Sequence, residues 1–328
     1  MGGPNAGHTF FAYGVDGERH KVVVQSMPAA AMTGAIGVIG PAGVFIVSLL
    51  LQELVVAMQL TGKPAQLIID PRAAIITPEM MAAEEHLGAA IGSTREGVGK
   101  ATALKVMREP ITVYQNMDKL APIFNDPAGA AVAIQDTVPY VNQCLLQGRR
   151  VVIEGTQGYG LSLHTSGFYP FCTSRECTPH ALYAETGINP RNAKYGAREI
   201  MVVRTYPIRV GGNSGPLANE ISWDRLQEIT DGYVKTPEIT TVTKKVRRIA
   251  RMDFELLERA VLQTRPTSIA LTFLDYVFPK IAGLNPFQDL PDSPEVAEYL
   301  TSLEQTLGVH ISMVSTAQDI TIDTGERL

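Results

Sequence analysis

The 328-residue sequence has few cysteines and no excess of basic residues, and both shortages limit what the protein can be. Its three cysteines, Cys144, Cys172 and Cys177, are an odd and small number, which is typical of a reducing compartment and not of a disulfide framework. The 28 lysines and arginines are outnumbered by 33 aspartates and glutamates. Binding to a nucleic-acid backbone depends on a basic field. We therefore predict a cytoplasmic protein without a nucleic-acid partner.

A membrane segment is also missing from the sequence. The most apolar stretch, 44–60, is interrupted by Gln52 and Glu53 and is too short to span a bilayer comfortably. The N-terminus has neither the basic head nor the apolar run of a signal peptide. We expect no membrane partner, and we predict that 44–60 is a buried helix.

The sequence does contain short β-rich runs that alternate with helical patterns. Strands are expected at 20–27, 34–40, 65–70, 150–155, 199–208, 267–275 and 309–315, and helices at 42–60, 78–87, 128–147, 253–264 and 294–307. This alternation is typical of a parallel sheet covered on both faces. The predicted fold class is α/β, with three layers and a mostly parallel central sheet. No repeat or linker marks a boundary, so residues 1–328 are expected to form a single domain.

Four polar motifs carry the candidate chemistry, although the chain contains no Walker A motif. In GGPNAGHT, small residues allow close approach to a phosphate, Asn5 offers amide donors and His8 can exchange a proton with a reacting oxygen. The alternative is a flexible N-terminus with an incidental histidine. EGTQG, with YPFCTS a short loop later, would place amide and hydroxyl donors around one polar ligand, or form an ordinary strand exit and turn.

The other two motifs combine hydroxyl groups with cations. GSTREGVG precedes an expected helix that contains Lys105 and Arg108, and such a helix start can bind an anion. A plain surface loop is the competing interpretation. Residues 240–251 place threonines before five cations, which suits a dicarboxylate or phosphate because guanidinium groups bind carboxylates through two hydrogen bonds. A solvated charged face is the alternative.

Together the motifs resemble adenylosuccinate synthetase from its second strand to its C-terminus. The family's order is kept by seven separated motifs: GGPNAGHT, GSTREGVG with Arg108, EGTQG with YPFCTS, RVGGNSGP, TVTKKVRR with MDFE, LTFLD and a final VST. The resemblance implies a carbon–nitrogen ligase that joins L-aspartate to C6 of a purine nucleoside monophosphate. A nucleoside triphosphate, with Mg²⁺, phosphorylates the 6-oxygen, and the aspartate amine then displaces phosphate. One difficult substitution is thereby divided into two steps.

The resemblance also implies residue roles at the substrate nucleotide. His8 would support the transferred phosphoryl group, the Gly7 carbonyl would face Mg²⁺, and Gln157 would hold the activated 6-oxygen. The monophosphate would be bound by Asn5, Thr94 and Thr173. Arg108 matches an arginine that reaches the same phosphate across a homodimer, so a homodimer is implied.

Further roles are implied for the two other substrates. L-Aspartate would be bound by Thr241, Val242, Thr243, Lys245 and Arg247. The nucleoside triphosphate would be bound by Phe273, Asp275, Ser315 and Ala317. Within that set, Asp275 matches the aspartate that reads the base of the triphosphate.

The family begins with a strand and a glycine-rich loop containing Asp-Glu-Gly-Lys-Gly, which supplies the catalytic aspartate. The resemblance starts after that element. We expect roughly thirty further residues, a strand, a loop and part of a helix, upstream of Met1, because the other motifs remain. The alternative from another class is a non-catalytic purine-nucleotide-binding protein that kept only the monophosphate pocket.

Two departures from the family pattern concern the monophosphate. Lys245 stands where the family has an arginine that reaches aspartate and the ribose near its 2′-hydroxyl, and lysine cannot reproduce a guanidinium fork. RVGGNSGPLANE replaces the more usual RVGAGPFPTE. Both changes resemble the viral branch, which acts on dGMP to begin 2-aminoadenine nucleotides in the host cytoplasm. We predict dGMP as substrate, with IMP and GTP, as in the ordinary enzyme, as the alternative.

Two more departures concern the triphosphate. Phe273 replaces a lysine usually paired with the base-reading aspartate, and Ala317 stands where a glycine is usual. Because an aromatic ring can stack on any purine, ATP and dATP join GTP as expected co-substrates. The alternative is that Phe273 is a strand residue that points into the core.

Overall fold

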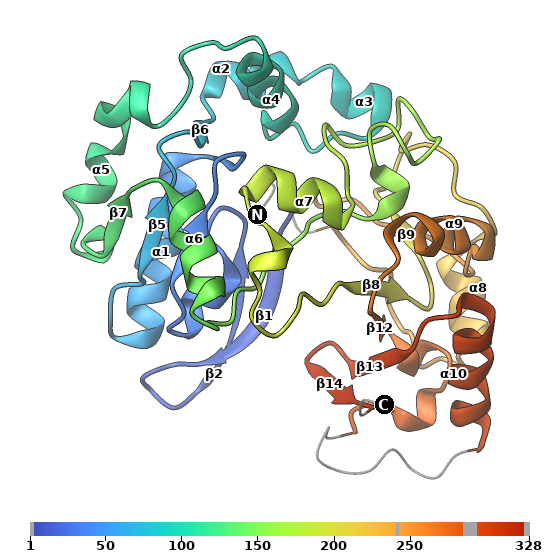
Figure 1. Ribbon diagram of the computed structural model, residues 1–328. Helices are drawn as coiled ribbons and strands as arrows, with labels where there is room; N and C mark the ends of the chain where they lie inside the picture. The colour runs from blue at the N-terminus through green and yellow to red at the C-terminus, as the bar shows by residue number, and fades with distance from the viewer. Residues whose placement is uncertain (1–2, 241–242, 285–293, 325–328) are drawn as a thin grey trace. The chain divides into compact units, whose positions relative to one another are not determined.

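The computed structural model describes residues 3–240, 243–284 and 294–324 of the chain. The chain forms two compact units, Met1–Ala197 (unit 1) and Arg198–Leu328 (unit 2), shown in Figure 1. A single domain over residues 1–328 stays a prediction. Among the described helices, none combines the length and apolar character that crossing a membrane requires.

Unit 1 contains parallel strand pairs and one antiparallel hairpin. Its parallel sheets have the orders β3-β5-β7 and β4-β6, and β1 pairs with β2 in the hairpin. The strands are β1 (His8–Tyr13), β2 (Arg19–Val24), β3 (Gly37–Ile39), β4 (Val44–Phe45), β5 (Leu67–Ile69), β6 (Ala74–Ile75) and β7 (Val132–Ile134). The hairpin starts at His8, so the first polar motif leads directly into β1.

The helices of unit 1 pack beside these strands. They are α1 (Val47–Thr61), α2 (Pro78–Ala83), α3 (Leu87–Ile91), α4 (Val98–Val106), α5 (Ala121–Phe124), α6 (Thr137–Leu146) and α7 (Pro179–Thr186), with 3₁₀ turns η1 (Ala29–Thr33), η2 (Tyr114–Leu120), η3 (Pro127–Gly129), η4 (Tyr159–Leu161) and η5 (Pro190–Asn192). Helix α1 confirms the predicted buried helix, because Leu50, Leu54 and Ala57 share one face and are fully buried in the core. It ends before Gly62, which takes the left-handed conformation that glycine adopts without strain.

One predicted element of unit 1 is wrong, and another is wrong in its first half. The expected strand 150–155 belongs to no sheet in the described structure, and 70% of the Val152 surface is exposed. Residues that favour a strand do not determine whether another strand lies beside them. A strand needs such a neighbour to form its ladder of hydrogen bonds. The expected helix 128–147 begins instead with η3 and β7. Asp136 then starts α6, because its carboxylate accepts a hydrogen bond from the Val138 N–H at 3.1 Å.

Unit 2 is built on a four-stranded sheet with the order β14-β13-β12-β8. Strands β8, β12 and β13 are parallel, and β14 is antiparallel to β13. They span β8 (Ile200–Arg204), β12 (Ser268–Thr272), β13 (Ile311–Ala317) and β14 (Ile320–Asp323). Helices α9 (Phe254–Thr264) and α10 (Pro294–Leu307) contribute Leu257, Val261 and Leu303 to its core. Parallel strands packed with helices confirm the predicted α/β fold class.

A second, antiparallel sheet in unit 2 has the order β10-β11-β9. Its strands and the neighbouring short helices are β9 (Ile208–Arg209), β10 (Glu220–Ile221), β11 (Arg248–Ala250), α8 (Trp223–Ile229), η6 (Leu274–Tyr276) and η7 (Pro279–Ile281). Leu226 and Ile249 are fully buried in a small core beneath this sheet. The fourth polar motif therefore runs directly into a sheet strand, β11.

Candidate active site

The first polar motif is packed against the start of α4. A β-carbon on Gly3 would lie 2.8 Å from a Val44 methyl and 2.9 Å from a Val98 methyl, so only glycine fits this approach. The Pro4 carbonyl accepts a hydrogen bond from the Gln25 side-chain amide at 2.7 Å. These contacts favour a built site over the alternative of a loose N-terminal segment.

Asn5 and His8 each carry a buried polar atom without a partner among the described residues. These atoms are Asn5 Oδ1 and His8 Nε2. A buried polar group left without a hydrogen bond costs about 1–3 kcal/mol, and such groups mark functional positions. Burial lowers the pKa of His8 below 6.5, although the charge of Glu154 opposes this shift. The imidazole is therefore neutral at pH 7, with Nε2 ready to exchange a hydrogen bond with a ligand. Gly7, the expected source of a metal-facing carbonyl, immediately precedes it in the chain.

Glu154 is a site residue to which the motif pattern assigned no role. Its carboxylate accepts the Ala29 N–H at 3.2 Å and the Ala30 N–H at 3.4 Å, at the start of η1. The same carboxylate acts electrostatically on His8. The EGTQG motif is thus joined to the first motif in unit 1. An acidic residue is favoured where a helical turn presents free N–H groups. This preference is the sequence signal that could have identified Glu154.

Gln157 has a left-handed backbone, with φ of 60°. A non-glycine residue held in this conformation costs about 1–3 kcal/mol, and such residues cluster at active sites. The Gln157 side-chain carbonyl accepts a hydrogen bond from the Thr156 hydroxyl at 2.7 Å. Because the carbonyl is engaged, the NH₂ group of the amide is the part that can donate to a ligand oxygen.

The loops that carry Thr94 and Thr173 meet at the first turn of α4. Thr94 is half-buried in the segment that leads into this helix. A β-carbon on Gly99, in the first turn, would lie 3.7 Å from the Ser174 β-carbon. Thr173 is fixed by its N–H, which donates to the Leu161 carbonyl at 2.8 Å. The segment that carries Thr173 thus lies beside the first turn of α4, and the segment that carries Thr94 leads into the same turn.

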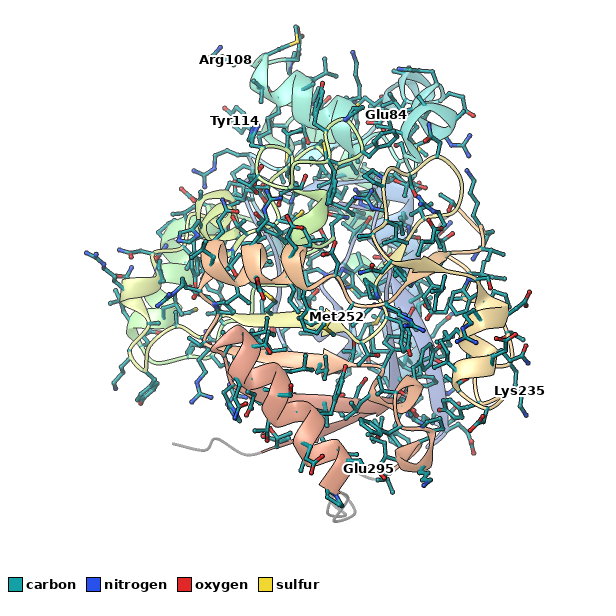
Figure 2. All side chains as sticks on the ribbon, turned by 90° about the vertical axis from the view of Figure 1, so that its right-hand side faces the viewer. Glu84, Arg108, Tyr114, Lys235, Met252 and Glu295 are labelled. Carbon is teal, nitrogen blue, oxygen red and sulfur yellow. The ribbon has the colours of Figure 1, made fainter. Side chains whose placement is uncertain are left out.

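The N-terminus of α4 is itself already capped by Glu84, which Figure 2 labels. The Glu84 carboxylate accepts the Gly97 N–H at 3.0 Å and the Lys100 N–H at 2.7 Å. An anion-binding helix start, one interpretation of GSTREGVG, is therefore wrong for these two N–H groups. A carboxylate from the chain takes the place that a phosphate would need.

Arg108 lies beyond the other end of α4, with an exposed side chain and φ of 67°. It lines an open cavity of about 660 Å³ together with Arg72, Lys105 and Tyr114. Figure 2 shows Arg108 and Tyr114 close together on this side of unit 1. The Lys105 ammonium donates to the Pro41 and Arg72 carbonyls. Arg108 is thus separated from Thr94 by the whole of α4, nine residues or about 14 Å.

In unit 2, candidate residues gather where β8, β12 and β13 end. Carboxyl ends of parallel strands meet at one sheet edge, which is where ligands bind in α/β folds. The Phe273 N–H donates to the Ser315 hydroxyl at 3.1 Å, and its carbonyl accepts from the Thr205 hydroxyl at 2.6 Å. Ala317 is the last residue of β13. Phe273 follows β12 with φ of 63°, so the alternative that it is a core strand residue is wrong.

The Phe273 ring belongs to an aromatic and charged cluster. The Arg204 guanidinium carbon lies 3.6 Å from the centre of this ring, and the Tyr276 ring meets it edge-on at 5.0 Å. Asp275 is only 5% exposed and accepts a hydrogen bond from the Tyr233 hydroxyl at 2.9 Å. Burial raises the pKa of Asp275, and the hydrogen bond opposes the shift. Sequence reasoning missed Tyr233, because it lies 42 positions away from its partner.

The described residues on either side of the gap in the predicted aspartate loop are hydrogen-bonded to one another in unit 2. Thr241 and Val242, predicted to bind aspartate, lie outside the described residues. Thr240 closes the turn: its N–H donates to the Lys245 carbonyl at 2.9 Å, and its hydroxyl accepts the Lys245 N–H at 2.9 Å. The Thr240 and Thr243 hydroxyls are 2.6 Å apart.

Arg247 and Arg248 follow this turn and have different surroundings. Arg247 forms an ion pair with Glu238 at 3.2 Å, yet its Nε is buried without a partner among the described residues. Arg248 donates two hydrogen bonds to Glu220, at 2.8 Å and 2.6 Å. Arg248 is therefore held within the chain, whereas Arg247 retains one buried donor without a partner among the described residues.

RVGGNSGP packs directly on the aspartate loop. A β-carbon on Gly211 would lie 2.2 Å from the Val246 carbonyl oxygen, and one on Gly212 would lie 3.9 Å from the Lys245 ammonium. The two motifs that depart from the family pattern are therefore in contact. Within the described part of the chain, no cluster of three His, Cys, Asp or Glu side chains could hold a metal ion.

The adenylosuccinate synthetase family matches residues 1–126 and 124–280 of the chain. N6-succino-2-amino-2′-deoxyadenylate synthase from Vibrio phage phiVC8 is 32% identical over 301 residues, which cover 90% of this chain and 80% of that protein. Adenylosuccinate synthetase from Methanocaldococcus jannaschii is 32% identical over 336 residues, or 99% of this chain and 88% of the relative.

Two solved structures are similar to the chain. One is cyanophage S-2L succinoaminodeoxyadenylate synthetase bound to dGMP and dATP as an energy donor, with a TM-score of 0.73, 27% identity and coverage of 99% of this chain and 86% of that chain. The other is fully ligated adenylosuccinate synthetase from Plasmodium falciparum, with a TM-score of 0.74, 20% identity and coverage of 98% and 92%, which shows the fold alone. The chain belongs to the adenylosuccinate synthetase family of ligases.

Proposed function

We propose that the protein joins L-aspartate to C6 of dGMP, at the expense of a purine nucleoside triphosphate with Mg²⁺, to give N6-succino-2-amino-2′-deoxyadenylate. The observation that carries the choice of dGMP is the contact between Gly212, which departs from the usual loop, and Lys245: a β-carbon on Gly212 would lie 3.9 Å from the Lys245 ammonium. Two separate departures from the family pattern form one local structure at the residues proposed to bind aspartate and to lie near the ribose.

This contact bears on the ribose through Lys245. An ammonium group cannot make the paired hydrogen bonds of a guanidinium, so a 2′-hydroxyl loses a partner when lysine replaces arginine. A 2′-deoxynucleotide has no such group to satisfy. Gly212 stands where the usual loop has alanine, and a β-carbon there would lie 3.9 Å from the Lys245 ammonium. Similarity to the Vibrio phage synthase, whose name gives the same product, and to the cyanophage synthetase bound to dGMP supports this substrate.

In the first chemical step, the 6-oxygen of the purine forms a bond to the terminal phosphorus of the triphosphate, while the bond from that phosphorus to the bridging oxygen breaks and the nucleoside diphosphate leaves. The Gln157 NH₂ group donates to that oxygen, since the carbonyl of its amide is held by Thr156. Neutral His8 donates from Nε2 to an oxygen of the moving phosphoryl group. Preorganised donors of this kind stabilise charge as it develops.

Mg²⁺, when bound with the triphosphate, would neutralise phosphate charge during this transfer. It takes one or two protein oxygens and completes its shell with phosphates and water. A single carbonyl, that of Gly7, therefore fits the proposed role without a cluster of acidic side chains.

In the second step, the aspartate amine forms a bond to C6 while the C6–O bond breaks and phosphate leaves. Arg247 and the Thr243 hydroxyl hold the aspartate carboxylates in this proposal. The support is the buried Nε of Arg247, which has no described partner. Held geometry of this kind turns a bimolecular attack into a step within one complex.

We also propose a homodimer in which Arg108 reaches the monophosphate of the partner. Arg108 and Thr94 are separated by the length of α4, which favours different subunits for their shared phosphate. Exposed apolar side chains surround Arg108, since Val106, Met107 and Tyr114 are 73%, 67% and 78% exposed. Apolar surface of this kind beside a functional arginine is typical of an interface.

The test is a substrate panel with the full protein. Purified enzyme with dGMP, L-aspartate, ATP and Mg²⁺ should form the succinylated product, detected by mass, and IMP should be a poor substrate. Efficient turnover of IMP without turnover of dGMP would overturn the choice of dGMP and establish the ordinary adenylosuccinate reaction. Gln157→Ala is the matched control: it should abolish phosphoryl activation and leave dGMP binding measurable.

A further inference from the structure

Glu238 lies between two arginines of unit 2, shortly before the predicted aspartate loop. Its Oε2 accepts a hydrogen bond from Arg247 Nη1 at 3.2 Å, and its Oε1 accepts one from Arg204 Nη2 at 2.5 Å. Only 18% of the Glu238 side chain is exposed. Neither the family motifs nor the proposed reaction steps assign a role to this shared carboxylate.

The Arg204 side of this carboxylate is fixed. Arg204 is the last residue of β8, and only 19% of its side chain is exposed. Its guanidinium carbon lies 3.6 Å from the centre of the Phe273 ring, and its Nε donates to the Tyr206 carbonyl at 3.1 Å. Because Arg204 is held by the ring and the carbonyl as well as by Glu238, it keeps the Glu238 carboxylate in place beside Arg247.

The main chain of Arg247 is fixed as well. Its N–H donates to the Glu238 carbonyl at 2.9 Å, and Ile239 pairs with Val246 in an antiparallel bridge. Its carbonyl accepts a hydrogen bond from the Trp223 indole N–H at 2.7 Å. Both ends of the Arg247 side chain are therefore held, one through the backbone and one through Nη1, and the direction of the guanidinium follows from these two points.

The contact with Glu238 leaves one edge of the Arg247 guanidinium for a ligand. A guanidinium binds a carboxylate most specifically through two parallel hydrogen bonds, and Nε and Nη2 form an edge that can donate both. Glu238 accepts from Nη1, which is not part of this edge. The Nε group is buried without a partner among the described residues. A substrate carboxylate can therefore bind this edge while Glu238 stays in place.

We infer that Glu238 is a positioning residue for L-aspartate, which orients the Nε–Nη2 edge of Arg247 towards a carboxylate of this substrate. The inference rests on the proposed function, which assigns aspartate to Arg247. Charge and position act in opposite directions here, because the Glu238 carboxylate also repels an anionic substrate. Loss of repulsion should strengthen the use of aspartate, whereas loss of the hold on Arg247 should weaken it. The sign of the effect separates the two roles.

The test measures kcat/KM for L-aspartate in the full protein, with Mg²⁺, ATP and whichever of dGMP and IMP turns over. Glu238→Asp keeps the charge beside Arg204 but withdraws the carboxylate by one methylene, so it no longer spans both arginines. Its kcat/KM for L-aspartate should fall about tenfold to a hundredfold, the factor that corresponds to a lost hydrogen bond between charged groups. The KM values for the monophosphate and for ATP should change by less than about threefold, a range too small to reflect such a loss.

Glu238→Gln tests the same contact without the charge. Its amide oxygen can stay with Arg204, and its NH₂ group then faces Arg247 Nη1, so that two donors meet. The kcat/KM for L-aspartate should again fall, although the repulsion of the substrate is gone. A rise in this value would show that Glu238 acts through its charge alone and would overturn the inference.

Two comparisons separate positioning from a general effect on the fold. Glu228→Gln removes the charge of an exposed glutamate that pairs with Arg225 in α8 at 2.7 Å, and it should leave the kinetics of all three substrates unchanged. Arg247→Ala should lower kcat/KM for L-aspartate at least as much as Glu238→Asp does. Combining the two changes should produce no further fall, because Glu238 acts through Arg247. Additive effects would contradict this route.

The inference fails alone if Arg247→Ala impairs the use of L-aspartate and Glu238→Asp does not. It also fails if Glu238→Asp impairs all three substrates alike or does not fold, because the residue would then serve the fold. Failure of the proposed function looks different: Arg247→Ala leaves the L-aspartate kinetics unchanged, or no succinylated product forms, and both proposals fall together. The choice of dGMP can fail by itself, since IMP serves equally well in this test.

Discussion

Replacing Gly211 by alanine adds one methyl group at the contact between the RVGGNSGP loop and the aspartate turn. The new β-carbon would lie 2.2 Å from the Val246 carbonyl oxygen, whereas ordinary contacts lie near about 3.5 Å. The two backbones therefore have to separate by about 1 Å. Overpacking of this kind destabilises a protein by about 1–3 kcal/mol, and a misplacement of about 1 Å costs roughly a hundredfold in rate.

We expect Gly211→Ala to lower kcat/KM for L-aspartate by about tenfold to a hundredfold, because Lys245 and Arg247 move with the turn. The KM for dGMP should change by less than about threefold, since Asn5, Thr94 and Thr173 lie in unit 1. Initial rates with each substrate varied in turn give both values.

Gly232→Ala is the control for this prediction. It places alanine at a positive φ of 77° with no atom within 4 Å of the new β-carbon, so it adds backbone strain without a clash. It should lower the melting temperature and leave the aspartate kinetics unchanged. Unchanged aspartate kinetics in Gly211→Ala, with a stability loss like that of the control, would refute this reasoning.

Three further predictions concern unit 1. His8→Ala should lower kcat by about a hundredfold or more. Because burial lowers the pKa of His8 below 6.5, the activity of the wild type should stay level as the pH falls to 6.5 and decline only below it. A decline centred above pH 7 would contradict the role assigned to His8. Arg108→Ala should raise the KM for dGMP, and mixing it with inactive His8→Ala should restore activity if subunits exchange, whereas mixtures no more active than their parts would exclude a role across the dimer. Burial opposes ionisation of Asp70, but hydrogen bonds from Arg72 and Thr137 lower its pKa to about 2. The ionised carboxylate therefore contributes about 2 kcal/mol to the free energy of unfolding above pH 4, and this contribution is lost as the pH falls towards 2. Asp70→Asn should remove this part of the acid transition in a circular-dichroism titration.

The elements predicted well from the sequence are those whose pattern is long and local. Helix α1 carries an apolar face over fifteen residues, so its burial follows from its own sequence. The run 150–155 contains three consecutive β-branched residues at 151–153, but a strand also depends on a neighbour that the run itself does not specify. Likewise, β7 is set by pairing with β5, which lies over sixty positions earlier in the chain.

The candidate site shows the same division. The sequence supplied His8, Gln157, Thr94 and Thr173, and the structure brings their segments together within unit 1. The sequence identified neither Glu84 as the cap of α4 nor Tyr233 as the partner of Asp275. Each of these contacts joins residues 13 or more positions apart, and no local pattern marks which distant side chain takes the position. Composition and motif order identify chemical groups, whereas contacts between distant segments decide which groups are already engaged.

The Glu84 cap has a consequence for how the enzyme depends on its own concentration. A helix start would ordinarily supply about half a positive charge to a bound phosphate, but here a carboxylate cancels it. In the proposed dimer, the charge that balances the phosphate of dGMP comes from Arg108 of the second subunit. Substrate binding and association are then coupled by mass action, so dGMP should tighten the dimer and dilution should inactivate the enzyme.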